Sequence, residues 1–93
     1  MTEKAVRVVI EGRVQAVWFR GWTIDEARRR NLRGWVRNRM DGSVEALLAG
    51  AEADVDDMIE ACRQGPPAAH VTDVTPYPAE DPGGGGFRYL PTA

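Results

Sequence analysis

Residues 11–20 form a segment that can bind an oxyanion, because it combines a predicted loop with an arginine at its end. The segment links a predicted strand to a predicted helix, so several consecutive backbone N–H groups have no obligatory partner. Such amides can form an anion-binding nest that the helix dipole reinforces. Arg20 can add a bidentate guanidinium contact to two phosphate oxygens. The alternative is an ordinary connection with a surface arginine.

Asn38 is the second residue whose type suggests chemistry. An asparagine near a hairpin often serves the turn itself. Here Asp41-Gly42 already supplies the turn, and Asn38 lies in the preceding strand, where asparagine is disfavoured. The mismatch between residue type and position points to function, with turn chemistry as the alternative.

Other reactive residue types have simpler explanations. His70 has no Cys, Asp or Glu nearby at ligand spacing and is expected to be exposed on a strand. Cys62 is expected to be a small buried thiol on an apolar helix face. Residues 83–86 are four consecutive glycines without the Lys-Ser/Thr of a phosphate loop, so they predict a flexible linker. The three tryptophans are expected to pack in the core or at its rim.

The elements that must position Arg20 and Asn38 follow from the hydrophobic pattern. Helices are predicted over residues 21–31 and 51–65, and Asn31 is expected to cap the first in the left-handed conformation. Strands are predicted over residues 5–11, 34–39, 43–50 and 70–77, with a short final strand over residues 87–90.

The local signals behind these elements differ in kind. Apolar residues alternate from Val6 to Ile10, the period of a strand with one face on a core. Asp41-Gly42 predicts a tight type I′ hairpin turn. From Val55 onward, apolar residues fall at i, i+3, i+4 and i+7, which is one face of a helix.

Two strand-helix-strand units joined by a hairpin predict a ferredoxin-like βαββαβ fold. This is an α/β sandwich (α+β) in which an antiparallel sheet carries two helices on one face. The fold hosts many functions, so it does not by itself indicate an activity.

The length and the charge of the chain limit the functions that the protein can have. The 93 residues suit one domain spanning residues 1–93 and leave little volume for a deep cofactor pocket. The net charge is +6 over residues 1–40 and −8 over residues 41–93. The basic half could attract nucleic acid or phosphate groups, or pair with the acidic half. A single cysteine and a polar N-terminus without an apolar span favour a cytoplasmic protein.

Two segments carry a resemblance to a known family. Residues 12–20 read GRVQAVWFR and residues 34–50 read GWVRNRMDGSVEALLAG. Together they resemble the two signature motifs of the acylphosphatases, and looser features extend the resemblance over nearly the whole chain. Two motifs at the right separation are a specific signal, whereas either alone is moderately specific.

The resemblance implies a metal-independent hydrolase that converts acyl phosphates (carboxyl-phosphate anhydrides) to a carboxylate and inorganic phosphate. It implies that Asn38 holds the attacking water and that Arg20 and the loop amides bind the phosphoryl group. The substrate-binding residues are then Gln15, Ala16, Val17, Trp18, Phe19 and Arg20. These groups are sufficient for the hydrolysis, because a carboxylate whose conjugate acid has a pKa of about 4 leaves without a general acid. A loose phosphoryl transition state mainly needs positioning and charge stabilisation.

Ala16 departs from the family pattern, which usually has glycine at this position. If the loop requires a positive φ here, alanine strains it by roughly 1–2 kcal/mol while keeping the amide donor. The hypothesis is that Ala16 weakens phosphate binding or lowers the rate without abolishing activity.

Rival functions share the predicted fold. RNA-recognition domains have the same element order, but residues 34–40 and 43–50 lack their paired aromatics, so no nucleic-acid partner is expected. A regulatory small-ligand domain is disfavoured by the pairing of Arg20 with Asn38. Hydrogenase-maturation proteins carry a similar domain together with further domains that are not expected here. We expect a monomer that acts on a small-molecule acyl phosphate, with no cofactor, no metal and no membrane association.

Overall fold

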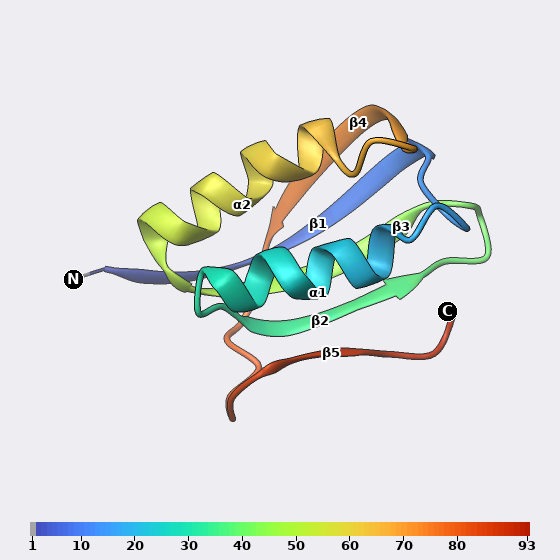
Figure 1. Ribbon diagram of the computed structural model, residues 1–93. Helices are drawn as coiled ribbons and strands as arrows, with labels where there is room; N and C mark the ends of the chain where they lie inside the picture. Colours follow the sequence, from blue (N-terminus) through green and yellow to red (C-terminus); the bar gives the residue numbers. More distant parts are fainter. Residues whose placement is uncertain (1) are drawn as a thin grey trace.

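The computed structural model describes residues 2–93 as two helices on one face of a five-stranded sheet (Figure 1). The strands are β1 (Glu3–Arg13), β2 (Arg33–Asn38), β3 (Val44–Ala51), β4 (His70–Pro78) and β5 (Phe87–Tyr89). The helices are α1 (Phe19–Arg29) and α2 (Glu52–Gln64). Every predicted element is present, and the predicted ferredoxin-like fold is confirmed.

The strand order in the sheet is β4-β1-β3-β2-β5. The four long strands pair antiparallel, as expected, whereas β5 runs parallel to β2 and makes the sheet mixed. The parallel pairing arises because residues 79–86 carry the chain from β4 at one edge of the sheet to β5 at the other (Figure 1). As a result β5 lies beside the strand that ends at Asn38.

The core lies between the sheet and the two helices. Val6, Val8 and Ile10 alternate toward the helices and are at most 9% exposed, so the predicted alternation is confirmed. Full burial of an aliphatic side chain of this size contributes about 1.5–3 kcal/mol. The predicted apolar face of α2 is also buried; it consists of Val55, Met58, Ile59 and Cys62.

Helix α1 begins at Phe19, two residues before the predicted start. Trp18 precedes it in the left-handed conformation, with φ 62°, and the Thr23 hydroxyl donates to the Phe19 carbonyl at 2.8 Å. Beyond the other end of the helix Asn31 has φ 56°, which confirms the predicted left-handed cap. Neither helix in residues 2–93 is long and apolar enough to cross a membrane.

The β2–β3 hairpin is confirmed, but the predicted type I′ turn is wrong. Gly42 is left-handed, with φ 95°, whereas Asp41 has no positive φ. The Gly42 amide bonds to the Arg39 carbonyl, so Met40 and Asp41 are the central residues of the turn. The Asp41 side chain stabilises this geometry, because its Oδ1 accepts bonds from the amide and the hydroxyl of Ser43.

Candidate active site

A small hollow lies where the β1–α1 loop meets the ends of β2 and β5. It encloses about 80 Å³, several times the roughly 10–15 Å³ that one water needs. Arg20 and Asn38, the two residues singled out from the sequence, both line it. Its lining residues are Val14, Ala16, Trp18, Phe19, Arg20, Gly21, Asn38 and Tyr89.

The loop before α1 presents several backbone amides without an intramolecular partner. Ala16 and Trp18 are both left-handed, with φ 59° and 62°. Left-handed residues alternating with others in a short loop are typical of anion-binding nests. Within residues 2–93 no acceptor takes a hydrogen bond from the amides of residues 15–18. The amides of Phe19 and Arg20 follow in the first turn of α1, where helical bonding offers them no acceptor.

Arg20 keeps its guanidinium donors available. In the described part of the chain it forms no ion pair and donates no side-chain hydrogen bond, although most other arginines do one or the other. Its guanidinium carbon lies 5.4 Å from the centroid of the Tyr89 ring. A free guanidinium on the wall of a hollow is suited to bidentate binding of two phosphoryl oxygens.

Asn38 lines the same hollow and carries a buried acceptor. Its side-chain oxygen Oδ1 is buried and has no hydrogen-bond partner among the described residues. Its backbone is held on both sides, because it pairs with Val44 of β3 and its carbonyl accepts from the Ala93 amide at 3.0 Å. A buried acceptor without a partner costs about 1–3 kcal/mol.

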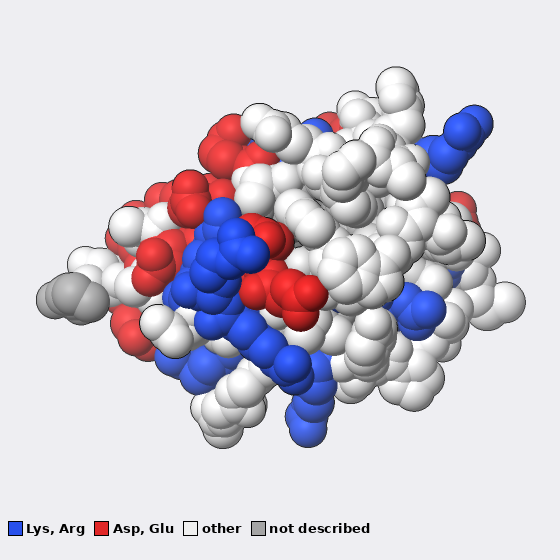
Figure 2. Space-filling view, viewed as in Figure 1, with Lys and Arg blue, Asp and Glu red and all other residues white. Residues whose placement is uncertain are grey.

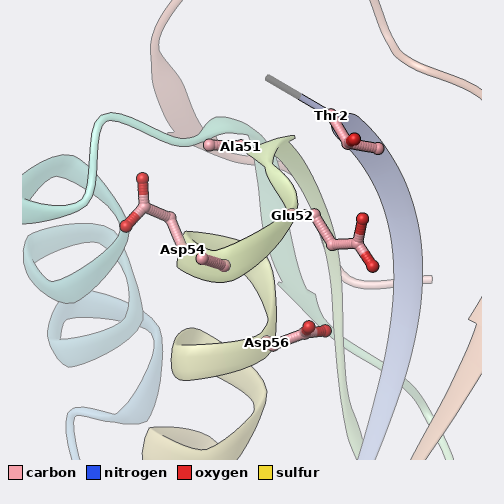
Figure 3. A pocket seen from close by; sticks show the side chains of 6 residues that line it. Thr2, Ala51, Glu52, Asp54 and Asp56 are labelled. Atoms are coloured by element: carbon pink, nitrogen blue, oxygen red, sulfur yellow. The ribbon is translucent and has the colours of Figure 1, made fainter.

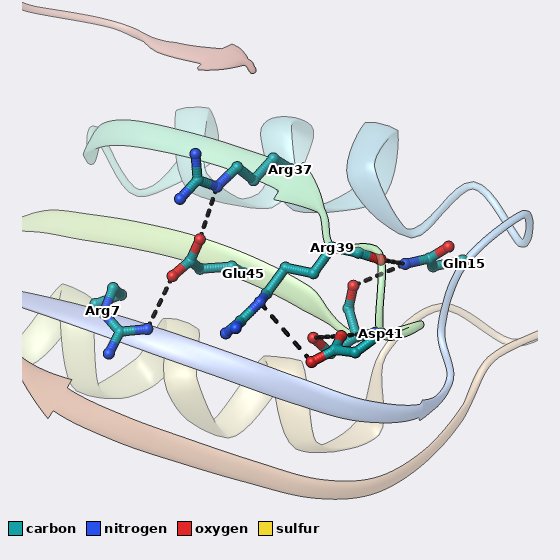
Figure 4. Close-up of polar contacts among 7 residues, drawn as sticks. Arg7, Gln15, Arg37, Arg39, Asp41 and Glu45 are labelled. Atoms are coloured by element: carbon teal, nitrogen blue, oxygen red, sulfur yellow. Dashed lines mark hydrogen bonds and ion pairs between the residues drawn. The ribbon is translucent and has the colours of Figure 1, made fainter. Parts of the chain in front are cut away.

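Gln15 holds the loop rather than facing the hollow with its side chain. Its Nε2 donates to the carbonyl oxygens of Arg39, at 2.7 Å, and Ser43, at 2.8 Å (Figure 4). These two bonds tie the β1–α1 loop to the β2–β3 hairpin, directly after Asn38. The loop and Asn38 are therefore positioned as one unit.

The structure separates the predicted binding residues into two groups. Ala16, Trp18, Phe19 and Arg20 line the hollow, whereas Gln15 and Val17 do not. The lining residues that sequence reasoning missed are Val14, Gly21 and Tyr89. For Tyr89 the sequence pattern shows only the face of the strand: Tyr89 is two residues after Phe87 in a predicted strand, so both side chains face the same side. The pattern does not show which strand lies beside it.

Among the predicted binding residues, the apolar side chains differ in exposure. The Phe19 ring belongs to the core and is 1% exposed. Val17 is partly buried and packs against that core. Trp18 is 63% exposed at the rim. Contacts with a ligand from Phe19 and Val17 would therefore come from their backbone amides.

A larger open hollow, of about 520 Å³, lies at the start of α2 (Figure 3). Figure 3 shows three carboxylates around it, those of Glu52, Asp54 and Asp56. Asp56 also forms an ion pair with Lys4. This concentration of negative charge repels a phosphoryl group, so the smaller hollow is the candidate active site.

The basic and acidic halves of the chain largely pair with each other. Figure 2 shows a band of Lys and Arg side chains bordered by Asp and Glu. Six ion pairs of residues 2–93 join the halves; they are Lys4–Asp56, Arg7–Glu45, Arg30–Asp57, Arg33–Asp81, Arg37–Glu45 and Arg39–Asp41. Folding therefore pairs six basic residues of the first half with acidic residues of the second, and Arg20 is not among them.

Cys62 and His70 are placed as predicted. Cys62 is buried, and this burial raises the pKa of its thiol to about 12. His70 is exposed on β4. Among residues 2–93 no three His, Cys, Asp or Glu side chains gather as metal ligands would.

Comparisons with known proteins agree on one family. A model of the acylphosphatase family matches residues 6–89. An acylphosphatase from Rhodospirillum rubrum is 51% identical over 89 residues, which are 96% of this chain and 98% of that protein. The crystal structure of acylphosphatase from Bacillus subtilis has a TM-score of 0.90 at 37% identity and covers 96% of this chain and 99% of its own. Full-length HypF, in a phosphate- and nucleotide-bound form, matches with a TM-score of 0.89 at 25% identity over 98% of this chain and 12% of its own.

Proposed function

Because this chain belongs to the acylphosphatase family, we propose that Arg20 and the amides of residues 15–20 bind the phosphoryl group of an acyl phosphate while Asn38 holds the attacking water. As an acylphosphatase, the protein is a hydrolase of acyl phosphates. The proposal assigns the parts of this reaction to particular atoms of the chain.

The observation that carries the proposal is that Asn38, whose buried Oδ1 has no hydrogen-bond partner among the described residues, lines the same hollow as Arg20. In the proposed complex the Asn38 carboxamide takes a hydrogen bond from a water O–H. The oxygen lone pair of that water is then free to face phosphorus. Arg20 and the loop amides supply donors to the phosphoryl oxygens, on which charge accumulates in the transition state.

The bond changes need no further side chain. The water oxygen forms a bond to phosphorus as the bond from phosphorus to the acyl oxygen breaks. The acyl oxygen leaves as a carboxylate, whose conjugate acid has a pKa of about 4, so it departs without protonation. One proton of the water passes to a phosphoryl oxygen, and the products are the carboxylate and inorganic phosphate. Positioning and charge stabilisation are the contributions left to the protein.

The test is hydrolysis of benzoyl phosphate by the wild type, Arg20→Ala and Asn38→Ala, with phosphate affinity measured in parallel by calorimetry. Each variant is expected to lower kcat/KM by about 10²–10³-fold, the usual loss when one preorganised group is removed. Arg20→Ala is also expected to lose phosphate affinity, whereas Asn38→Ala is expected to keep it, because Asn38 is assigned to water.

Arg13→Ala is the matched control for Arg20→Ala. Arg13 is exposed at the end of β1 and has no side-chain partner in the described chain, so its loss removes the same charge outside the hollow. It is expected to leave kcat/KM within about twofold. Retention of activity by folded Arg20→Ala and Asn38→Ala would refute the assignment of residues, and an inactive wild type would refute the substrate class.

A further inference from the structure

Tyr89 lies against Arg20 at the candidate active site, although it belongs to neither of the two motifs. Its ring centroid is 5.4 Å from the Arg20 guanidinium carbon, within the range of a cation–π contact. Both residues line the hollow together with Asn38. Within residues 2–93 the Arg20 guanidinium has this cation–π contact and neither a side-chain hydrogen bond nor an ion pair.

The nature of this contact suits an arginine that must bind an anion. A carboxylate partner would restrict the guanidinium, but it would occupy the N–H donors that a phosphoryl group needs. An aromatic ring contacts the guanidinium through its flat face and leaves the N–H groups at its edge available. The ring can therefore limit the rotamers of Arg20 without competing with the ligand.

The fold places Tyr89 through the parallel pairing of β5 with β2. Tyr89 is opposite Val36, and the next amide, that of Leu90, donates to the Val36 carbonyl at 3.0 Å. Phe87, on the same face of β5, is 2% exposed and anchors the strand in the core. Tyr89 itself is 52% exposed. Its ring is thus held over Arg20 by backbone pairing while contributing little to the core.

We propose that Tyr89 is a positioning residue for Arg20, holding the guanidinium at the hollow with its donors free for the phosphoryl group. This inference rests on the proposed function, because it takes Arg20 as the phosphate ligand. The role belongs to the aromatic ring and not to the phenol hydroxyl. The same contact therefore survives in phenylalanine and is lost in leucine.

The experiment measures the affinity for inorganic phosphate by calorimetry, together with the kinetics of benzoyl phosphate hydrolysis. Tyr89→Leu is expected to weaken phosphate binding and to raise KM by about two- to fivefold, the size of an exposed cation–π contact, with kcat changed less than twofold. Tyr89→Phe is expected to behave as the wild type. In an Arg20→Ala background, Tyr89→Leu is expected to cause no further loss.

Tyr77→Leu is the matched control. Tyr77 is also an exposed tyrosine, 42% accessible, and its ring also stacks on an arginine, Arg7, at 4.5 Å. It lies on β4, away from the hollow. Its loss is expected to leave phosphate affinity unchanged.

Three results would overturn the role of Tyr89. They are wild-type phosphate affinity in Tyr89→Leu, an equal loss in Tyr89→Phe, and a further loss caused by Tyr89→Leu in the Arg20→Ala background. Each can occur while Arg20→Ala alone still loses phosphate affinity, which leaves the proposed function intact. Undiminished phosphate affinity in Arg20→Ala would instead overturn the proposed function, and the role of Tyr89 with it.

Discussion

Gln15 and Arg39 are joined by a hydrogen bond of 2.7 Å from the glutamine Nε2 to the arginine carbonyl oxygen. A second bond runs from the same nitrogen to the Ser43 carbonyl. Because Arg39 directly follows Asn38, this side chain connects the loop that contains Ala16 to the strand end that contains the water-binding candidate. One glutamine side chain therefore links the two halves of the site.

Removing this connection is expected to lower both stability and activity. Gln15→Ala loses two partly buried hydrogen bonds, each contributing about 0.5–1.5 kcal/mol, so the free energy of unfolding should fall by about 1–3 kcal/mol. A lower kcat/KM is expected because the loop can then move relative to Asn38. Urea denaturation and benzoyl phosphate kinetics provide the measurements. Gln64→Ala, at the exposed end of α2, is the control and should change the free energy of unfolding by less than about 0.5 kcal/mol. A loss as large as that of Gln15→Ala would contradict the role given to the Gln15 hydrogen bonds.

Ala16 adopts φ 59°, a left-handed conformation that glycine takes at no steric cost. The loop therefore has the positive φ at residue 16 that the hypothesis about Ala16 requires. Ala16→Gly relieves a strain of roughly 1–2 kcal/mol, which offsets the greater flexibility of glycine in the unfolded chain. We expect a lower KM or a higher kcat for benzoyl phosphate, with stability unchanged or raised.

A second alanine-to-glycine change controls for this prediction. Ala61 lies inside α2, where Ala61→Gly should lower the free energy of unfolding by about 1 kcal/mol. Steady-state kinetics and urea denaturation compare the two variants. If Ala16→Gly improved neither KM nor kcat, the hypothesis about Ala16 would be wrong.

Glu45 makes the stability of the protein depend on pH in the acid range. The carboxylate is 7% exposed, between Arg7 at 2.8 Å and Arg37 at 2.7 Å (Figure 4). Burial by itself raises the pKa of Glu45, but the hydrogen bonds from Arg37 and Arg7 outweigh it, and the pKa is lowered. Since the unfolded value is about 4.3, this stabilisation is present above that pH and is lost as the pH falls through the lower folded pKa.

Glu45→Gln is therefore expected to lower the free energy of unfolding by about 1–3 kcal/mol at pH 7, and by progressively less below pH 4. Urea denaturation between pH 3 and pH 7 measures this difference. Glu80→Gln, at an exposed carboxylate without an ion pair in residues 2–93, should show no such trend. A difference that stayed constant across the range would contradict the assigned ionic contribution.

Cys62 is expected to be unreactive in the folded protein. Burial raises the pKa of its thiol to about 12, whereas a thiol in the unfolded chain has a pKa of about 8.5. Iodoacetamide at pH 8 should therefore label urea-unfolded protein and spare native protein, as followed by mass spectrometry. Because the folded pKa is the higher one, the contribution of Cys62 to stability is full below about pH 8.5 and is lost as the pH rises toward 12. Cys62→Ala should lack this alkaline loss, and rapid labelling of native protein would contradict the prediction.

Local sequence patterns predicted most of the fold, because they depend on neighbours along the chain. The alternation from Val6 to Ile10 and the helical spacing of α2 both specify which side must be buried. The hairpin was predicted at the correct position, but its turn type was not. The bonds from Ser43 to Asp41 Oδ1 stabilise the observed turn, and the dipeptide Asp41-Gly42 alone does not contain this information.

The sequence by itself determined the residue types of the site, since the two motifs place Arg20 at a helix start and Asn38 in a strand. Only the tertiary structure decided that both line one hollow, that Asn38 Oδ1 has no partner among the described residues, and that Tyr89 lies against Arg20. The reason is that these relations depend on strand pairing between distant segments. The parallel pairing of β5 with β2 follows a glycine-rich linker, and a run of glycines does not specify a path for the chain. Packing of β5 against the rest of the sheet decides this pairing.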